Sequence, residues 1–269
     1  IVKTAGMTSC RAASTPQVDY VQPAQEDVDP AETKQVVAEM NVARVNGQLN
    51  FLRKTRFDML MPLSEVSRLA HRTRLVDLKA IKRVVRYING TPTMGPTYHK
   101  QKDHGLVGFC DTNYGDEVHT SLIFYLFGGP WFARASRQRL VQLSAFGAEM
   151  VGLCEASKAC IYLRELLREM GFRLEKPTPI YCDNKAVVDV VMNRDCWTSK
   201  VRHYRIRLAW VRQRIEEGDI MVHHVGTKDN VADLGTKPLP LPAFRDLRGQ
   251  VLGHAPLRAL VGVEEGARE

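Results

Sequence analysis

The spacing of apolar residues predicts a helical segment followed by a region of short strands and helices. Residues 42–90 carry a helical period, and an apolar stripe in their second half is flanked by lysines and arginines. The stripe consists of Leu78, Ile81, Val85 and Ile88. We expect Asp77 to cap this helix and Gly90 to end it. Residues 1–40 are rich in Ala, Thr, Pro, Gln and Asp and lack a period, which predicts an irregular, partly disordered start.

From residue 105 onward, short apolar runs are separated by turn residues, which is typical of β-strands. The first three runs read L-V-G-F-C-D, V-H-T-S-L-I-F-Y-L-F and W-F-A-R. A long helix capped by Ser144 and ended by Gly171 follows. After it come the strand P-T-P-I-Y-C-D, two helices, the strand D-I-M-V-H-H-V and a short helix from near Asp229 to Gly235. This order predicts an α/β fold, a mixed five-stranded sheet flanked by helices and preceded by a mainly helical segment.

Four acidic residues, far apart in the sequence, can meet at one edge of this sheet. Asp111 and Asp183 each end an apolar strand, and the crossover helix between the strands makes them parallel neighbours. Glu149 lies in the second turn of the long helix on the face turned to the sheet, and Asp233 lies on the last helix. A lone Asp at a strand end is more often a turn residue, so the prediction rests on all four. Together they can offset the charge of two Mg²⁺ ions held about 3.5–4 Å apart, as in phosphodiester-cleaving sites.

Composition and charge narrow the class of protein only a little. Hydrophobic residues make up 44% and charged residues 25%, as in globular proteins, and no apolar stretch approaches the ~18 residues of a transmembrane helix. A net charge of +8 is compatible with a polyanionic partner, and equally with a basic protein that binds none. The six cysteines form no C-x-x-C pair, which argues against zinc and indicates buried thiols in a reducing compartment. The start I-V-K-T-A-G lacks Met and a signal peptide, so we expect a piece of a longer chain.

The segments around the four acids form an ordered set of motifs. They read V-G-F-C-D-T-N-Y-G, L-S-A-F-G-A-E-M-V-G-L, I-Y-C-D-N-K and N-V-A-D-L-G-T-K. In this order and spacing they resemble the RNase H domain of copia-type LTR retrotransposon Pol polyproteins. The earlier segments G-M-T-S-C-R-A-A-S-T-P, N-G-Q-L-N-F-L-R-K-T-R-F-D-M and R-V-V-R-Y-I-N-G-T resemble the end of the reverse transcriptase and its thumb and connection segment.

The resemblance implies a ribonuclease H-like fold and an endonuclease that cuts the RNA strand of RNA–DNA hybrids. It implies two Mg²⁺ ions, for which Mn²⁺ can substitute, and places catalytic metal ligands at Asp111, Glu149, Asp183 and Asp233. The implied partners are the hybrid and the remainder of the reverse-transcriptase polyprotein, with no membrane, inside the cell in the cytoplasm or nucleus. No Y-x-D-D motif occurs, so the polymerase active site is absent from this chain.

The resemblance also suggests how the chain divides. We expect the irregular end of the reverse-transcriptase region at 1–40, a helical thumb or connection segment at 41–100, an RNase H-like domain at 101–240 and a C-terminal tail at 241–269. Hybrid binding needs cations near phosphates and polar groups that sense a 2′-hydroxyl. The candidates are Asn113, Asn184, Arg202, Arg205, Arg207 and Arg212. For the arginines, a solvated helix face is the competing interpretation.

Two other functions stay open at this point. Asn113 stands where the family usually has a second Asp, and Phe146-Gly147 replaces a usual Thr-Glu, which suggests a copy under relaxed constraint. The alternative is therefore a catalytically decayed domain that binds hybrids without cutting them. A strand-transfer enzyme of the same superfamily ranks last, because such enzymes generally use three acids at a different spacing.

Overall fold

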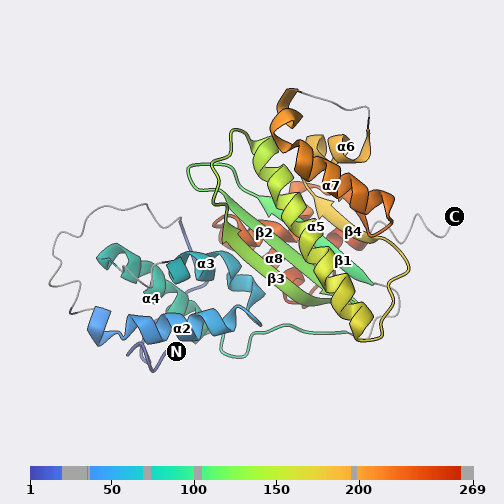
Figure 1. The fold of residues 1–269 in the computed structure, drawn as a ribbon. Coiled ribbons are helices and arrows are strands. Elements are labelled where there is room, and N and C mark those ends of the chain that lie inside the picture. Colours follow the sequence, from blue (N-terminus) through green and yellow to red (C-terminus); the bar gives the residue numbers. More distant parts are fainter. Residues whose placement is uncertain (20–34, 36, 69–73, 100–104, 195–198, 262–269) are drawn as a thin grey trace.

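The computed structural model describes residues 1–19, 35, 37–68, 74–99, 105–194 and 199–261 (Figure 1). A mainly helical N-terminal segment stands beside a sheet that carries helices on both faces. Among the described residues, no helix is long and apolar enough to cross a membrane. The expected irregular segment lies in part outside the described residues, since 20–34 and 36 are not among them.

The N-terminal segment consists of short helices. They are α2 (Val42–Leu52), the 3-10 helix η1 (Phe57–Met59), α3 (Leu60–Arg68) and α4 (Leu75–Gly90). Helix α4 ends at Gly90 as predicted, but the prediction for its start is wrong, because Asp77 is the third helical residue and not the cap. Asp77 instead accepts a hydrogen bond from the Arg74 backbone amide at 2.9 Å, one half of a capping box.

The sheet contains five strands and mixes the two pairing directions. They are β1 (Leu106–Thr112), β2 (His119–Leu126), β3 (Gly129–Arg137), β4 (Thr178–Cys182) and β5 (Ile220–His224). Their order is β3-β2-β1-β4-β5, with β1, β2 and β3 antiparallel and with β4 parallel to both β1 and β5. The crossover through a helix explains the parallel pairs. The predicted fold class, a ribonuclease H-like mixed five-stranded sheet with flanking helices and a helical segment before it, is confirmed.

One face of the sheet is covered by the helices that connect its parallel strands. They are α5 (Ala145–Glu169), α6 (Lys185–Met192), the 3-10 helix η3 (Ser199–Tyr204) and α7 (Arg205–Glu216). Ser144 caps α5 as predicted, and its hydroxyl accepts a hydrogen bond from the Gly147 amide at 3.1 Å. Helix α5 lies across the strands in Figure 1 and packs its buried side chains into one apolar cluster with them.

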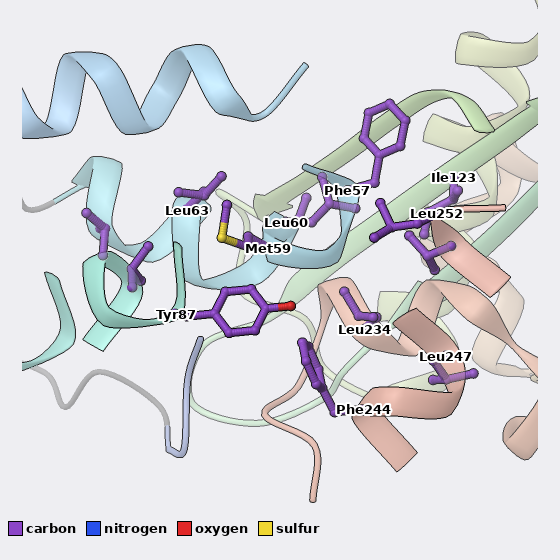
Figure 2. Packing of buried hydrophobic residues seen from close by; sticks show 14 of the residues in the cluster. Phe57, Met59, Leu60, Leu63, Tyr87, Ile123, Leu234, Phe244, Leu247 and Leu252 are labelled. Carbon is purple, nitrogen blue, oxygen red and sulfur yellow. The ribbon is translucent and has the colours of Figure 1, made fainter. Parts of the chain in front are cut away.

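The opposite face is covered by elements from both ends of the chain. They include the 3-10 helix η5 (Val231–Gly235), α8 (Leu241–Val251) and the N-terminal helices. The 3-10 helix η4 (Thr227–Asp229), which has no buried residue, precedes η5, and α9 (Arg258–Val261) follows α8. Figure 2 shows Tyr87 of α4 beside Phe244 of α8, with Leu234 of η5 nearby. The predicted last helix is thus a single 3-10 turn. Helix α8 lies where the pattern predicted no element, although Phe244, Leu247 and Val251 keep helical spacing.

Candidate metal centre

The parallel pairing of β1 and β4 places two carboxyl groups at one edge of the sheet. Cys110 and Cys182 are direct partners in this pairing, so Asp111 and Asp183 follow them at the same end of their strands. Asp111 is 4% exposed, whereas Asp183 is only partly buried. The edge therefore presents one deeply placed carboxyl group beside a more accessible one.

Glu149 reaches the same edge because α5 lies unusually close to β1. A Cβ atom added to Gly152 would stand 2.2 Å from the Thr112 hydroxyl oxygen, so only glycine permits this approach. Glu149, one turn before Gly152, is buried, and its Oε2 atom has no hydrogen-bond partner among the described residues. An unpaired buried carboxyl oxygen is costly, which indicates that this atom is arranged for a ligand.

Asp233 is positioned by a 3-10 turn that Asn230 fastens to β1. The Asn230 side-chain amide donates to the Cys110 carbonyl at 2.9 Å, and its oxygen accepts from the Ala232 amide at 3.2 Å. Gly235 lets the turn approach β2, because a Cβ atom there would lie 2.2 Å from the Ser121 hydroxyl oxygen. Asp233 is thereby held, buried, over the end of β1.

The structure brings the four acids predicted from the sequence together. One ligand atom each from Asp111, Asp183 and Asp233 lie within 4.8 Å of one another, and the same holds for Glu149, Cys182 and Asp183. Asp183 belongs to both groups, so the two groups are adjacent. Carboxylate oxygens at this spacing can hold a divalent cation, while their role as ligands stays a prediction.

Burial and mutual repulsion raise the pKa of every acid in the cluster. Desolvation, followed by the charge of Asp233, raises the pKa of Asp111 to about 6. Desolvation raises the pKa of Glu149 to about 11, with the neighbouring Cys182, Asp111 and Asp183 adding to it. The pKa values of Asp183 and Asp233 are raised as well, again chiefly by desolvation. The surrounding protein thus does not compensate the full negative charge of the ionised cluster, and a bound cation would favour the ionised form.

Two residues that the sequence analysis did not single out touch the acids. The Thr236 hydroxyl donates a hydrogen bond to Asp111, and the Lys237 ammonium group lies 2.7 Å from Asp233. Desolvation lowers the pKa of Lys237, but its hydrogen bond to Asp233 and the charges of the acids outweigh this and raise it. Their spacing after Asp233 was the available signal, because residues three and four positions on lie on the same side of a helical turn.

The six predicted nucleic-acid contacts lie in two different settings. Asn113 accepts a hydrogen bond from the His119 amide and closes the β1–β2 turn, and Asn184 caps α6 by accepting from the Val187 amide at 3.2 Å. The four arginines, 202, 205, 207 and 212, all line one surface hollow of about 930 Å³. Arg212 also donates to the Asn193 carbonyl at 2.8 Å and ties α7 to the end of α6.

One residue that lines this hollow contacts the start of α5. Tyr204 lines it, and a Cβ atom added to Gly147 would lie 1.9 Å from the Tyr204 hydroxyl oxygen. Gly147 stands two residues before Glu149, and positions two apart on a helix face different sides, so this contact does not place the hollow beside the carboxyl groups. This contact also explains the glycine at position 147, which would otherwise only weaken the helix.

The fold and the site together define an α/β protein with a buried carboxylate cluster suited to divalent cations. Its sequence relatives are polyproteins of mobile elements. The chain is 31% identical over 210 residues to the retrovirus-related Pol polyprotein from transposon RE1 of Arabidopsis thaliana, a match that covers 76% of the chain. It is 27% identical over 195 residues, 71% of the chain, to the corresponding polyprotein from transposon TNT 1-94 of Nicotiana tabacum. The chain spans only 14% of either relative.

Other comparisons are more distant. The transposon Ty1-NL2 Gag-Pol polyprotein of Saccharomyces cerevisiae is 24% identical over 238 residues, which cover 84% of the chain and 13% of that polyprotein. RNase H1 from Halobacterium salinarum superposes with a TM-score of 0.36 and 12% identity over 48% of this chain and 91% of that chain. This last likeness is too distant to add to the sequence relationship, and no family model matches. The resemblance stated from the motifs is confirmed, and the chain is a homologue of a segment of copia-type retrotransposon Pol polyproteins.

Proposed function

We propose that this chain is a metal-dependent endonuclease of the RNase H type, which cleaves the RNA strand of RNA–DNA hybrids as part of a retrotransposon polyprotein. The convergence of Asp111, Glu149, Asp183 and Asp233 from four separate elements is the observation that carries the proposal. We further propose residues 101–240 as its nuclease domain, with 41–100 as the thumb or connection segment.

The residues present fit a pair of hard divalent cations, Mg²⁺ or in its place Mn²⁺. Such ions prefer oxygen ligands, and the cluster offers carboxyl oxygens. Two of these oxygens have no hydrogen-bond partner among the described residues, namely Glu149 Oε2 and Asp233 Oδ1. Asp111, Asp183 and Asp233 would hold one ion, and Glu149 with Asp183 would contribute to the second. Bound there, the ions would lower the pKa of an attacking water and stabilise the charge on the leaving 3′ oxygen.

The chain itself supplies positioning and charge. Thr236 fixes Asp111, Asn230 fixes the turn that carries Asp233, and Gly152 sets the height of Glu149 above the sheet. The arginine-lined hollow offers cations for the hybrid's phosphates. Lys237 partly neutralises the acids, so it would also lie close to a phosphate bound there.

The test is cleavage of a labelled RNA–DNA hybrid by the full chain in Mg²⁺ and in Mn²⁺, beside single-stranded RNA and duplex DNA. We expect cuts only in the RNA strand of the hybrid and none after chelation. Asp111→Asn and Asp183→Asn should slow cleavage at least about 100-fold, the scale set by loss of one group that stabilises a transition state. Asp116→Asn, an exposed acid in the β1–β2 turn, is the matched control and should cut as the parent does.

Two outcomes would decide against the proposal in different ways. If Asp111→Asn and Asp183→Asn cut as fast as the parent, the acids are not the site. If the folded parent binds the hybrid, with an affinity that falls with salt, yet gives no product even in Mn²⁺, the chain is the non-catalytic hybrid-binding domain.

A further inference from the structure

A cysteine lies among the acids of the candidate metal centre. The ligand atoms of Glu149, Cys182 and Asp183 all lie within 4.8 Å of one another, as do those of Asp111, Asp183 and Asp233. The group with Cys182 offers one sulfur and two carboxyl oxygens, whereas the group with Asp111 offers carboxyl oxygens alone. Mg²⁺ binds through oxygen, so a thiol in this position has no evident use in the proposed function.

The fold fixes the sulfur in this position. Cys182 is the last residue of β4 and is fully buried in the cluster under α5, the helix that carries Glu149. Its partner across the sheet, Cys110, points to the same side, and the neighbouring Cys182 thiol raises the pKa of the Cys110 thiol. Asp183 follows beyond the end of the strand and is partly exposed, which leaves an entry for an ion from the edge.

We propose that Glu149, Cys182 and Asp183 form a binding site for a thiophilic divalent cation such as Zn²⁺ or Cd²⁺. A carboxyl oxygen of Glu149 belongs to this group, and the Glu149 Oε2 atom is buried and has no hydrogen-bond partner among the described residues. Zn²⁺ and Cd²⁺ bind thiolates, and a site of three protein ligands leaves the fourth position of a tetrahedral ion to water. On binding, the thiol proton passes to water as the metal–sulfur bond forms.

The spacing of cysteines in the sequence does not predict this site. The lack of a C-x-x-C pair argues only against a zinc site built from neighbouring cysteines. The proposed site uses one cysteine and two carboxyl groups from a helix, a strand and the loop after it. Only the pairing of β4 beside β1 under α5 brings them together.

Occupation of this site would interfere with hybrid cleavage, because Glu149 and Asp183 are shared with the proposed Mg²⁺ ligands. First-row divalent metals bind such sites in an order that places Zn²⁺ above Mn²⁺, and the sulfur adds to this preference. The thiophilic ion would then act as an inhibitor. This consequence rests on the proposed function, whereas the binding itself does not.

The binding test is a Cd²⁺ titration of the full chain followed by its sulfur-to-cadmium charge-transfer absorption. The parent carries Cys10→Ser and Cys196→Ser, so that the remaining thiols, at 110, 154, 160 and 182, are all buried. We expect a saturable band that Cys182→Ser removes and that Cys154→Ser, a buried cysteine of α5, leaves intact. Glu149→Gln keeps the thiol but should weaken Cd²⁺ binding at least tenfold. A site made of thiols alone would bind Cd²⁺ as tightly in this variant as in the parent.

A folded parent without the band, or a Cys182→Ser variant with an unchanged band and affinity, would overturn the proposed site. The inhibition is tested separately in the hybrid cleavage assay at fixed Mg²⁺. Zn²⁺ should inhibit the parent, and Cys182→Ser should need at least tenfold more Zn²⁺ for half inhibition relative to its own uninhibited rate. If the chain cuts no hybrid, the proposed function is wrong, and the Cd²⁺ band alone still tests the proposed binding site. If the band is present but cleavage is insensitive to Zn²⁺, the inhibitory role of the bound ion is wrong.

Discussion

Asp111 shows how burial makes a single side chain expensive until something balances its charge. Thr236 donates to it and Lys237 is nearby, yet desolvation and Asp233 still raise its pKa to about 6. Without a bound cation, ionised Asp111 lowers the free energy of unfolding. A bound ion would remove that cost, so the affinity for the ion and the stability of the chain are linked.

Asp111→Asn should therefore stabilise the metal-free protein at neutral pH. The folded pKa is raised from 3.8 to about 6, so between these values the folded chain binds a proton that the unfolded chain has lost, and stability falls as pH rises. The penalty is absent below about pH 4 and complete above about pH 6. Urea unfolding in chelator should show a gain of about 1–3 kcal/mol near pH 7 and none near pH 4. An equal gain at both pH values would contradict this account, and Asp116→Asn serves as control.

The residues of the cluster could be predicted from the sequence, but two of their contacts with distant elements could not. Asp111 and Asp183 end apolar strands and Glu149 lies on the inner face of a helix, which are all local signals. The bond from Asn230 to the Cys110 carbonyl and the nearness of Cys182 to Glu149 depend on how distant elements pack. Such contacts depend on how α5 and η5 pack against the paired strands β1 and β4, which no local pattern encodes.

At the scale of elements, the height of α5 above the sheet decides where Glu149 lies. Gly152→Ala places a methyl group against the Thr112 hydroxyl, which also contacts Thr120 at 3.2 Å. We expect overpacking to lower the free energy of unfolding by about 1–3 kcal/mol, which is more than the better helix propensity of Ala raises it. Thermal unfolding measures this, and the proposed nuclease activity should fall with it.

Two companion variants make the Gly152 test specific. Gly47 is exposed on α2 and has nothing near its Cβ position. Gly47→Ala should therefore raise the free energy of unfolding by about 0.5–1 kcal/mol. Thr112→Ala removes the clashing hydroxyl, so the double variant should lose less than the two single losses added together. Strict additivity would show that the approach of α5 to β1 is not the cause.

A buried ion pair at η1 is linked to α4 by a hydrogen bond from Tyr87. Asp58, fully buried, accepts two hydrogen bonds from Arg56 at 2.9 and 2.8 Å and one from the Tyr87 hydroxyl at 2.6 Å. Asp58→Ala leaves Arg56 buried without its partner and should cost about 3–5 kcal/mol in chemical unfolding, against nearly nothing for the exposed Asp116→Ala. A loss under about 1 kcal/mol would mean that water replaces the carboxylate.

Most elements were predictable because each has its own local pattern. The five strands, and the span of α5 from its Ser144 cap to the glycine after its end, follow from alternation, helical spacing and capping residues. The start of α4 was misplaced because Asp77 can cap from two positions, and the Arg74 side chain that selects between them is not a usual capping group. Helix α8 has regular spacing but follows a run of prolines, which is equally typical of a loop.

At the scale of the whole molecule, the N-terminal helices and the sheet share one core. A single apolar cluster includes Leu49 and Leu60 of the N-terminal helices, Phe109 and Ile123 of the sheet, and Leu247 of α8. Figure 2 shows Leu60, Ile123 and Leu247 of this cluster together with Tyr87 and Phe244, whose rings are 5.8 Å apart. The face of the sheet away from α5 is therefore covered in part by residues that precede it by many positions in the chain.

Removal of residues 1–100 should consequently prevent stable folding of the remainder. Loss of the N-terminal helices exposes apolar residues of η5, α8 and the sheet, such as Leu234 and Phe244, at about 25 cal/mol for each Å². We expect the truncated chain to aggregate or to unfold without cooperativity, as seen by circular dichroism, and to recover when residues 1–100 are supplied as a separate chain. A truncated chain with a cooperative transition equal to that of the parent would show that the shared core is dispensable.

The placement of Asp233 also has a consequence for the order of events during synthesis. A polypeptide leaves the ribosome from its N-terminus, so β1, α5 and β4 emerge well before the 3-10 turn that carries Asp233 and the lysine after it. Asn230 must then reach back to β1, the first strand made, before the fourth carboxyl group is in place. A ribosome still translating this stretch of message therefore holds a nascent chain whose acidic cluster is incomplete, and the site forms only after its own coding sequence has been read.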